Sequence, residues 1–250
     1  MTVHSRCTAR PSPARSQPVY SSASHRPPPA TPAAAPVTEL DLFTDADAPL
    51  PLPPGVKRLE GFALAWEHEL LEEIARVVAA APLRNMVTPG GQTMSVAMTN
   101  CGALGWVSDR GGYRYSRLDP QTGRPWPMLP PSIRRLAAGA AEAAGYPSFD
   151  PDACLINRYE PGARMSLHQD RDERDRNAPI VSVSLGLPAT FLFGGLTRRD
   201  RPIRFALAHG DVVVWGGPNR LAFHGVAPVA DGQHPRLGRQ RINLTLRCAG

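Results

Sequence analysis

Two histidines and one aspartate are the side chains of this sequence best suited to hold a metal ion. In His168-Gln169-Asp170 the two ligand types stand two residues apart, and in a strand this spacing places both side chains on one face. His224 lies 54 residues beyond Asp170 and supplies a second histidine. Two histidines and one carboxylate form the facial triad typical of non-haem Fe(II) oxygenases. The sequence therefore predicts an iron site at His168, Asp170 and His224, with positions left open for a chelating cosubstrate and O2.

A second His-x-Asp motif, His209-Gly210-Asp211, offers an alternative source of ligands. Gly210 and Asp211 stand immediately before the apolar run 212–215, which is typical of a tight turn entering a buried strand. His209 and His224 are nevertheless close enough in the sequence to lie side by side on a hairpin. His-x-Asp tripeptides are also common where no metal is bound, so the spacing alone leaves the choice of motif open.

Arg241 and Arg247 stand at the two ends of an alternating segment, Arg-Ile-Asn-Leu-Thr-Leu-Arg. The alternation is also typical of an edge strand with one face in water. However, arginines bind carboxylates in a planar, bidentate manner, and their long side chains can converge across roughly 20 Å of strand. Asn157 and Tyr159 share one face of another alternating segment. Together the two segments predict a cavity lined by polar side chains that binds a short dicarboxylic acid.

The regions around these residues predict a mainly β fold. Apolar residues recur with helical spacing over residues 65–80, and a second helix is expected from Ser132, as its N-cap, to about Ala144, ended by Gly145. Residues 88–115 are expected to form strands and loops. After residue 152, short β-branched runs follow one another without intervening helices, which favours an antiparallel sandwich or barrel. The expected strands are residues 154–159, 180–185, 190–193, 203–207, 211–215, 221–226 and 241–246.

Length, charge and cysteine content narrow the class of protein. A chain of 250 residues accommodates one well-buried domain, and no apolar run or leader-like segment predicts membrane insertion or export. The four cysteines are widely separated, which indicates a reducing, cytoplasmic environment rather than a disulfide framework. Residues 1–38 are rich in Pro, Ser, Ala and Arg, contain no acidic residue, and are expected to be disordered. The rest carries 24 basic and 22 acidic residues, so its charge permits nucleic-acid binding without requiring it.

The combination of motifs resembles the AlkB family of nucleic-acid dealkylases. The pattern His168-x-Asp170, His224 and Arg241-x5-Arg247 carries the resemblance, which is close to bacterial members of the family and covers about residues 40–250. Further matching segments are residues 41–43, 86–91, 93–102, 151–159 and 180–188. The resemblance implies a double-stranded β-helix, or jelly roll, supported by N-terminal helices. It also implies a dioxygenase domain at residues 39–250, with a nucleotide-recognition lid at 88–115 and the jelly-roll core at 152–250.

The family's functional residues can be carried over to matching positions. The resemblance implies that His168, Asp170 and His224 bind Fe(II). It implies that the cosubstrate 2-oxoglutarate is held by Arg241, Tyr159, Arg247, Asn157 and Asn243. Trp106 and His168 would enclose a damaged base, and Asp172 would accept a hydrogen bond from its exocyclic amine. The other implied substrate contacts are Tyr113, Arg198, Thr88 and Met98.

The implied reaction is oxidative demethylation of N-alkylated bases, such as N1-methyladenine and N3-methylcytosine, in the repair of alkylated DNA. The enzyme would consume 2-oxoglutarate and O2, release succinate and formaldehyde, and act as a monomer on single- or double-stranded DNA or on RNA. Flipping a base out of its stack costs a few kcal/mol, so single strands should be good substrates. Gln92 and Phe223 stand where the family has tyrosine, which bears on substrate preference. Two alternatives are a related oxygenase acting on RNA, protein or a small molecule, and a jelly-roll binding module without activity.

Overall fold

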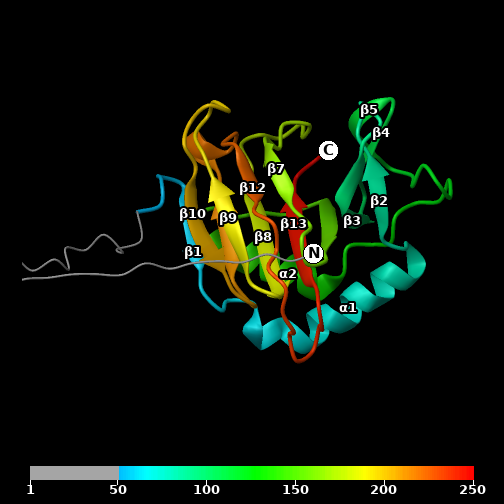
Figure 1. The fold of residues 1–250 in the computed structure, drawn as a ribbon, viewed down its shortest axis with the longest axis horizontal. Coiled ribbons are helices and arrows are strands. Elements are labelled where there is room, and N and C mark those ends of the chain that lie inside the picture. The colour runs from blue at the N-terminus through cyan, green and yellow to red at the C-terminus, as the bar shows by residue number, and fades with distance from the viewer. Residues whose placement is uncertain (1–50) are drawn as a thin grey trace, which may run out of the picture. The chain divides into compact units, whose positions relative to one another are not determined.

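The computed structural model describes residues 51–250, so the expectations for the extension 1–38 and the motif 41–43 lie outside the described residues. Two antiparallel sheets face each other, and two helices cover the outer face of the larger one (Figure 1). The larger sheet consists, in spatial order, of β1 (Val56–Leu59), β11 (Val212–Trp215), β8 (Ile180–Gly186), β13 (Arg241–Arg247), β6 (Ala153–Tyr159), β3 (Thr93–Gly102) and β2 (Arg84–Val87). The smaller consists of β10 (Ile203–Leu207), β9 (Ala189–Phe193), β12 (His224–Val226) and β7 (Met165–His168). This confirms the expected antiparallel jelly roll.

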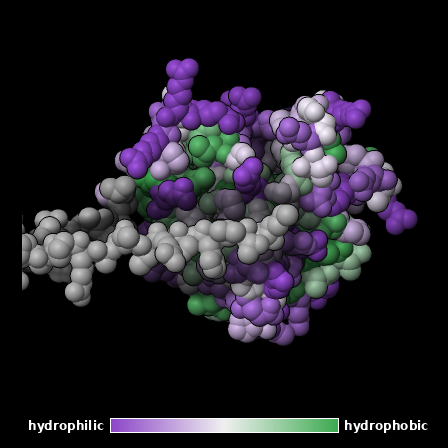
Figure 2. All heavy atoms as spheres, in the orientation of Figure 1, coloured by the Kyte–Doolittle hydropathy of each residue, from purple (hydrophilic) through white to green (hydrophobic). Residues whose placement is uncertain are grey.

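A separate hairpin and the helices complete the fold. The hairpin pairs β4 (Gly105–Asp109) with β5 (Gly112–Ser116), and β4 lies against β2, β3 and β6. The helices are α1 (Glu67–Ala80) and α2 (Pro131–Ala143), and two short 3-10 turns are η1 (Leu64–Trp66) and η2 (Gly217–Asn219). None of the helices within residues 51–250 is long and apolar enough to cross a membrane. Hydrophilic side chains gather along the upper edge of the molecule, over the ends of β9, β4 and β5 (Figure 2).

The two helices form where the sequence predicts them, although the start of α2 differs. In α1 the buried Leu70, Ile74 and Val77 follow one another at helical spacing and pack on the larger sheet. The expectation that Ser132 caps α2 is wrong, because the helix begins at Pro131, whose fixed φ and missing N–H suit the first helical position. The Ser132 hydroxyl instead donates a hydrogen bond to Glu73 of α1 and so joins the two helices.

Strand β13 separates an apolar layer from a polar one. Ile242, Leu244 and Leu246 point toward α1 and α2, in the cluster that fills the space between sheet and helices. Asn243, Thr245 and Arg247 point the other way and line the cavity between the two sheets. All seven residues of β13 are buried, with β8 on one side and β6 on the other, so the wet edge strand is excluded. The larger sheet thus carries an inward polar face, as the alternation predicted.

Candidate metal and cosubstrate site

Neighbouring strands of the smaller sheet position the two histidines. His168, the last residue of β7, lies directly opposite His224, the first residue of β12. A Cβ on the next residue, Gly225, would lie 2.6 Å from the carbonyl oxygen of Met165, so glycine allows this close approach of the two strands. The ring centroids of the two histidines are 4.4 Å apart. Residues 56 positions apart in the sequence are thereby brought into one site.

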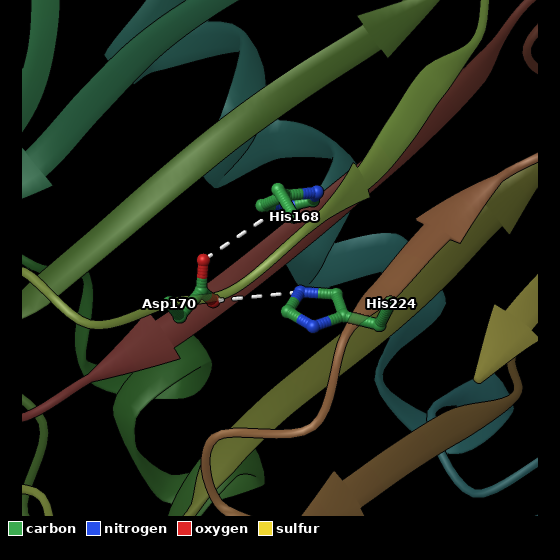
Figure 3. A group of neighbouring side chains, drawn as sticks. All are labelled: His168, Asp170 and His224. Atoms are coloured by element: carbon green, nitrogen blue, oxygen red, sulfur yellow. Dashed lines mark ion pairs between the residues drawn. The ribbon is translucent and has the colours of Figure 1, made fainter. Parts of the chain in front are cut away.

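Asp170 completes the triad from a loop rather than from a strand. The strand-like segment expected at 168–170 ends at His168, and Asp170 follows beyond the end of β7. Its Oδ1 lies 3.6 Å from His168 Nε2, and its Oδ2 lies 3.7 Å from His224 Nε2 (Figure 3). One ligand atom from each residue can be chosen so that all three lie within 4.8 Å of one another. Among residues 51–250 this is the one group of three or more such side chains arranged to hold a metal ion.

Hydrogen bonds and burial prepare both imidazoles for metal binding. The Nδ1–H of His168 donates to the carbonyl of Ser166 at 2.9 Å, and that of His224 donates to Ala222 at 3.1 Å. Each ring therefore presents its Nε2 toward Asp170, as metal-binding histidines commonly do. Burial lowers the pKa of His224 to about 3, assisted by the charge of His168, so the ring is neutral at physiological pH. A neutral imidazole is the form that binds a metal.

Arg247 holds the carboxylate of Asp170 ionised and oriented. Its Nη2 and Nε lie 2.6 and 2.8 Å from the same oxygen, Oδ2, which leaves Oδ1 free to bind a metal. Burial alone would raise the pKa of Asp170, but the adjacent charge of Arg247 outweighs it and lowers the pKa well below its ordinary value. Two imidazoles with one carboxylate fit Fe(II), and the site has the donor set of a facial triad.

Arg241 presents unpaired hydrogen-bond donors in the interior. Its side chain is fully buried, stacks on the ring of Tyr159 at 5.0 Å, and donates from Nη2 to Ser184 Oγ at 3.0 Å. Its Nε and Nη1 atoms have no hydrogen-bond partner within the described chain. Burial lowers the pKa of Arg241, an effect that neighbouring Tyr159 opposes. A buried cation with free donors is costly unless an anion pairs with it, so this position fits a carboxylate of 2-oxoglutarate.

A cavity between the two sheets joins the triad to further polar side chains. Asn157 Nδ2 donates to Asn243 Oδ1 at 3.2 Å, whereas Asn157 Oδ1 is buried with no partner in residues 51–250. His168, His224, Asn157, Asn243, Tyr159 and Arg247 all line the cavity. Its walls thus carry the two histidines of the triad and most of the residues expected to hold the cosubstrate. The side chains present fit a small polar dicarboxylate that also binds the metal.

The hairpin β4–β5 brings three of the expected substrate contacts together. The rings of Trp106 and Tyr113 stack with centroids 5.6 Å apart and planes 14° apart. Trp106 Nε1 donates to Asp172 Oδ2 at 3.1 Å, which places the hairpin beside the segment that follows Asp170. Tyr113 is half-exposed at 49%, so the stack offers an accessible aromatic surface. This arrangement suits the binding of a planar ring.

The other expected contacts are more dispersed. The Arg198 guanidinium lies 5.5 Å from the ring centroid of Phe223, the residue next to His224. Thr88 Oγ1 accepts a hydrogen bond from the backbone of Gln92 within the β2–β3 turn. Met98 is fully buried between the sheets, opposite Asn157, and its side chain is not accessible to a base in this structure.

Three residues of the site were not expected from the sequence. Glu173, Arg220 and Tyr115 form a buried or half-buried group around Arg247. Glu173 belongs to an acidic run that reads as a solvated loop, yet the residue is only 4% exposed. Its position just beyond the His-x-Asp motif is the one sequence feature that could have drawn attention to it.

His209 lies outside the site. Its Nε2 is 3.2 Å from Glu67 Oε1 of α1, and its Nδ1 accepts a hydrogen bond from the Gly186 amide at 2.8 Å. Gly210 has a φ of +88°, which confirms the turn before β11. The structure therefore resolves the choice between the two His-x-Asp motifs in favour of His168 and Asp170.

Comparisons with known proteins agree with this geometry. Residues 55–247 match the model of the 2OG-Fe(II) oxygenase superfamily. The chain is 58% identical over 212 residues to the alpha-ketoglutarate-dependent dioxygenase AlkB of Escherichia coli, covering 84% of this chain and 98% of that protein. It is 35% identical over 108 residues to the nucleic acid dioxygenase ALKBH1 of Mus musculus, covering 42% of this chain and 28% of that protein.

A solved structure supports the same conclusion. The structure of OsALKBH1 matches with a TM-score of 0.69 and 27% sequence identity, covering 79% of this chain and 99% of that chain. The superfamily model spans more than half of the chain, and the likeness to AlkB extends over nearly all of the bacterial protein. The chain therefore belongs to the 2OG-Fe(II) oxygenase superfamily and, within it, to the AlkB family of iron(II)- and 2-oxoglutarate-dependent dioxygenases.

Proposed function

We propose that this enzyme removes N-alkyl groups from nucleic-acid bases by oxidation, as in the repair of N1-methyladenine and N3-methylcytosine in DNA. The observation that carries the proposal is the Trp106–Tyr113 stack, joined through Asp172 to the loop that supplies Asp170. An aromatic surface beside an oxidising metal suits a base whose alkyl group must reach that metal. The mouse relative is itself named a nucleic acid dioxygenase.

In this proposal the cosubstrate is held by residues that line the cavity together with Arg241, which stacks on the lining residue Tyr159. Arg241, supported by Tyr159, pairs with the carboxylate distant from the metal through its free Nε and Nη1 donors. Asn157 and Asn243 contact the end nearer the triad, and Arg247 keeps Asp170 in place. Bound Fe(II) and 2-oxoglutarate supply the oxidation: O2 and 2-oxoglutarate give succinate and CO2, and one oxygen atom enters a C–H bond of the N-alkyl group. The hydroxymethyl product then loses formaldehyde and leaves the restored base.

Residues 88–115 serve in this proposal as the lid that recognises the base. Trp106 stacks on one face of the base, and His168, which is 38% exposed at its side chain, lies on the other. Asp172 has a second carboxylate oxygen beyond the one bonded to Trp106, and this oxygen accepts the exocyclic N–H. Its charge favours the cationic N1-methyladenine and N3-methylcytosine. Tyr113, Arg198 and Thr88 contact the neighbouring nucleotides.

The test is formaldehyde release from a single-stranded oligonucleotide carrying N1-methyladenine, with Fe(II), 2-oxoglutarate and O2. The parent enzyme should release formaldehyde and His168→Ala should not. His209→Ala serves as a matched control that removes a histidine outside the site and should retain release. If the parent forms succinate but no formaldehyde from any methylated DNA or RNA, the chain is a dioxygenase with another substrate and the proposal fails.

We further propose that the enzyme acts as a monomer in the cytoplasm and accepts single-stranded DNA, double-stranded DNA and RNA. Cytoplasmic location agrees with the four scattered cysteines, of which Cys101, Cys154 and Cys248 are unpaired in the described chain. Light scattering of the active protein measures its mass, and a dimer would contradict the monomer. Rates of formaldehyde release from matched DNA and RNA oligonucleotides rank the substrates. Absence of formaldehyde release from RNA would exclude RNA as a substrate.

A further inference from the structure

Five residues near the triad form a closed ring of hydrogen bonds. Arg247 donates to the Asp170 carboxylate and, from Nη1, to the Tyr115 hydroxyl oxygen at 3.3 Å. The Tyr115 hydroxyl donates to Glu173 Oε1 at 2.7 Å. Arg220 closes the ring, because it donates from Nη2 to Glu173 Oε2 at 3.2 Å and from Nη1 to the backbone carbonyl of Asp170 at 2.8 Å. Both the side chain and the main chain of the aspartate ligand are therefore held by this ring.

Tyr115 is the member of the ring that comes from the β4–β5 hairpin. The other four belong to β13, to η2's C-terminal end and to the segment after β7. Tyr115 lies directly opposite Trp106 in the hairpin. The Trp106 side chain, to which we assign base stacking, and Tyr115, whose hydroxyl contacts Arg247, are therefore cross-strand neighbours. Figure 1 shows this hairpin at one end of the molecule, beyond β2 and β3. A contact that orders the hairpin at Trp106 thus acts on the position of Tyr115 as well.

The tyrosine hydroxyl decides where the Arg247 guanidinium is directed. The Arg247 Nε atom lies 3.5 Å from Glu173 Oε1, which is a second carboxylate within reach of the same arginine. The hydroxyl donates a hydrogen bond to Glu173 Oε1 and accepts one from Arg247 Nη1. It therefore lies between these two charged groups. Without it, Arg247 can shift toward Glu173 and away from Asp170 Oδ2. The four charged members balance, two acids against two arginines, so the loss of the neutral hydroxyl leaves no net buried charge.

We propose that Tyr115 is a positioning residue that couples occupancy of the base-binding hairpin to the metal ligand Asp170 through Arg247. Stacking of a base on Trp106 holds the hairpin and its Tyr115 in place, and the hydroxyl then keeps Arg247 on Asp170 Oδ2 with Oδ1 presented to the metal. The metal site is therefore best formed when a substrate base is bound. This inference rests on the proposed function, because it requires nucleic acid on the hairpin.

The test measures Co(II) binding to the full-length protein without oxygen, so that no turnover occurs. Co(II) is titrated in the presence of 2-oxoglutarate, with and without a saturating oligonucleotide that carries N1-methyladenine. In the parent the oligonucleotide should tighten Co(II) binding by about fivefold or more, within the usual range of coupling between sites. Tyr115→Phe removes one oxygen atom and keeps the aromatic side chain. In this variant the oligonucleotide should leave Co(II) affinity unchanged, a factor of about one. Glu173→Gln, which weakens the acceptor of the hydroxyl, should also reduce it.

Tyr146→Phe is the matched control, because the Tyr146 hydroxyl also donates one hydrogen bond, to the Gly55 carbonyl at 2.8 Å, and this bond involves no member of the ring. In this variant the oligonucleotide should tighten Co(II) binding by the same factor as in the parent. An equal factor in the parent and in Tyr115→Phe would overturn the inference, as would a parent that binds the oligonucleotide with no effect on Co(II). A parent that does not bind the oligonucleotide at all would overturn the proposed function together with it.

Discussion

Replacing Arg241 with methionine should separate two effects of this buried charge: its cost in folding stability and its contribution to binding 2-oxoglutarate. In the free protein two buried guanidinium donors, Nε and Nη1, lack a partner within residues 51–250. Each unsatisfied buried donor costs about 1–3 kcal/mol, and the lost bond to Ser184 is worth about 1.5–3 kcal/mol. The free energy of unfolding of Arg241→Met should therefore fall by no more than about 1 kcal/mol or rise by up to about 4.5 kcal/mol. At about 2–4 °C per kcal/mol for a domain of this size, the Tm would rise by up to about 18 °C.

The same substitution should sharply weaken the binding of 2-oxoglutarate. Two charge-assisted hydrogen bonds at about 1.5–3 kcal/mol each correspond to a rise in KM of about a hundredfold or more. Succinate formation measures KM, and thermal denaturation with and without 2-oxoglutarate measures both the stability and the ligand-induced shift, which should disappear.

Arg158→Met is the matched control for this prediction. Arg158 is the neighbour of Tyr159 on β6 and also has a buried unpartnered Nε in the described chain, but its side chain alternates to the face of β6 opposite Asn157 and Tyr159, which line the cavity. Its loss should leave the KM for 2-oxoglutarate unchanged. An Arg241→Met protein that melts well below the parent and still shifts on addition of 2-oxoglutarate would refute the reasoning, because Arg241 would then be a structural residue.

Four further predictions concern the metal and the base. His168→Ala should abolish metal binding yet change the free energy of unfolding by less than about 1 kcal/mol, since the side chain is partly exposed. Asp170→Ala should lose metal binding and also about 3–5 kcal/mol of stability, because the buried Arg247 loses its nearer carboxylate and the buried charges no longer balance; equal stability of the two variants in urea would contradict this. Removal of metal by a chelator should lower the Tm of the parent and leave that of His168→Ala unchanged. Trp106→Ala should raise the KM for a methylated oligonucleotide by about tenfold, because base stacking is lost. The substrate-independent formation of succinate should persist. An unchanged KM would exclude Trp106 from the base site.

Residue types and alternation were sufficient to predict the parts of the site that lie on regular strands. The polar face of β13 follows from period-two alternation, and the structure confirms it with Asn243 and Thr245 in the cavity and Leu244 on the helix side. His168 and His224 were recognisable because few side chains bind iron. The sequence alone could not exclude His209, since its position relative to His224 depends on which strands pair.

Other parts depend on tertiary contacts that local sequence does not record. β1 and β2 were not predicted, because Val-Lys-Arg-Leu and Arg-Asn-Met-Val contain no run of three or more apolar residues, and β1 is a strand through its pairing with the buried β11. The burial of Glu173 depends on Arg220 and Tyr115, which come from distant segments. The N-cap expected at Ser132 was wrong because the preceding prolines already fix the start of the helix.

The place of β13 in the larger sheet has a consequence for the order in which the enzyme is assembled. It is the last strand in the sequence, yet it pairs with β8 on one side and β6 on the other, so these two strands cannot be joined before it arrives. A slip of one residue would turn Arg241 and Arg247 into the apolar layer beneath the helices, at a prohibitive cost in desolvation. During synthesis, the two halves of the larger sheet, β1-β11-β8 and β6-β3-β2, can therefore be joined only once β13 has been made. A chain made only as far as β12 has neither Arg241 nor Arg247. It acquires the capacity to activate oxygen only when β13 completes the larger sheet.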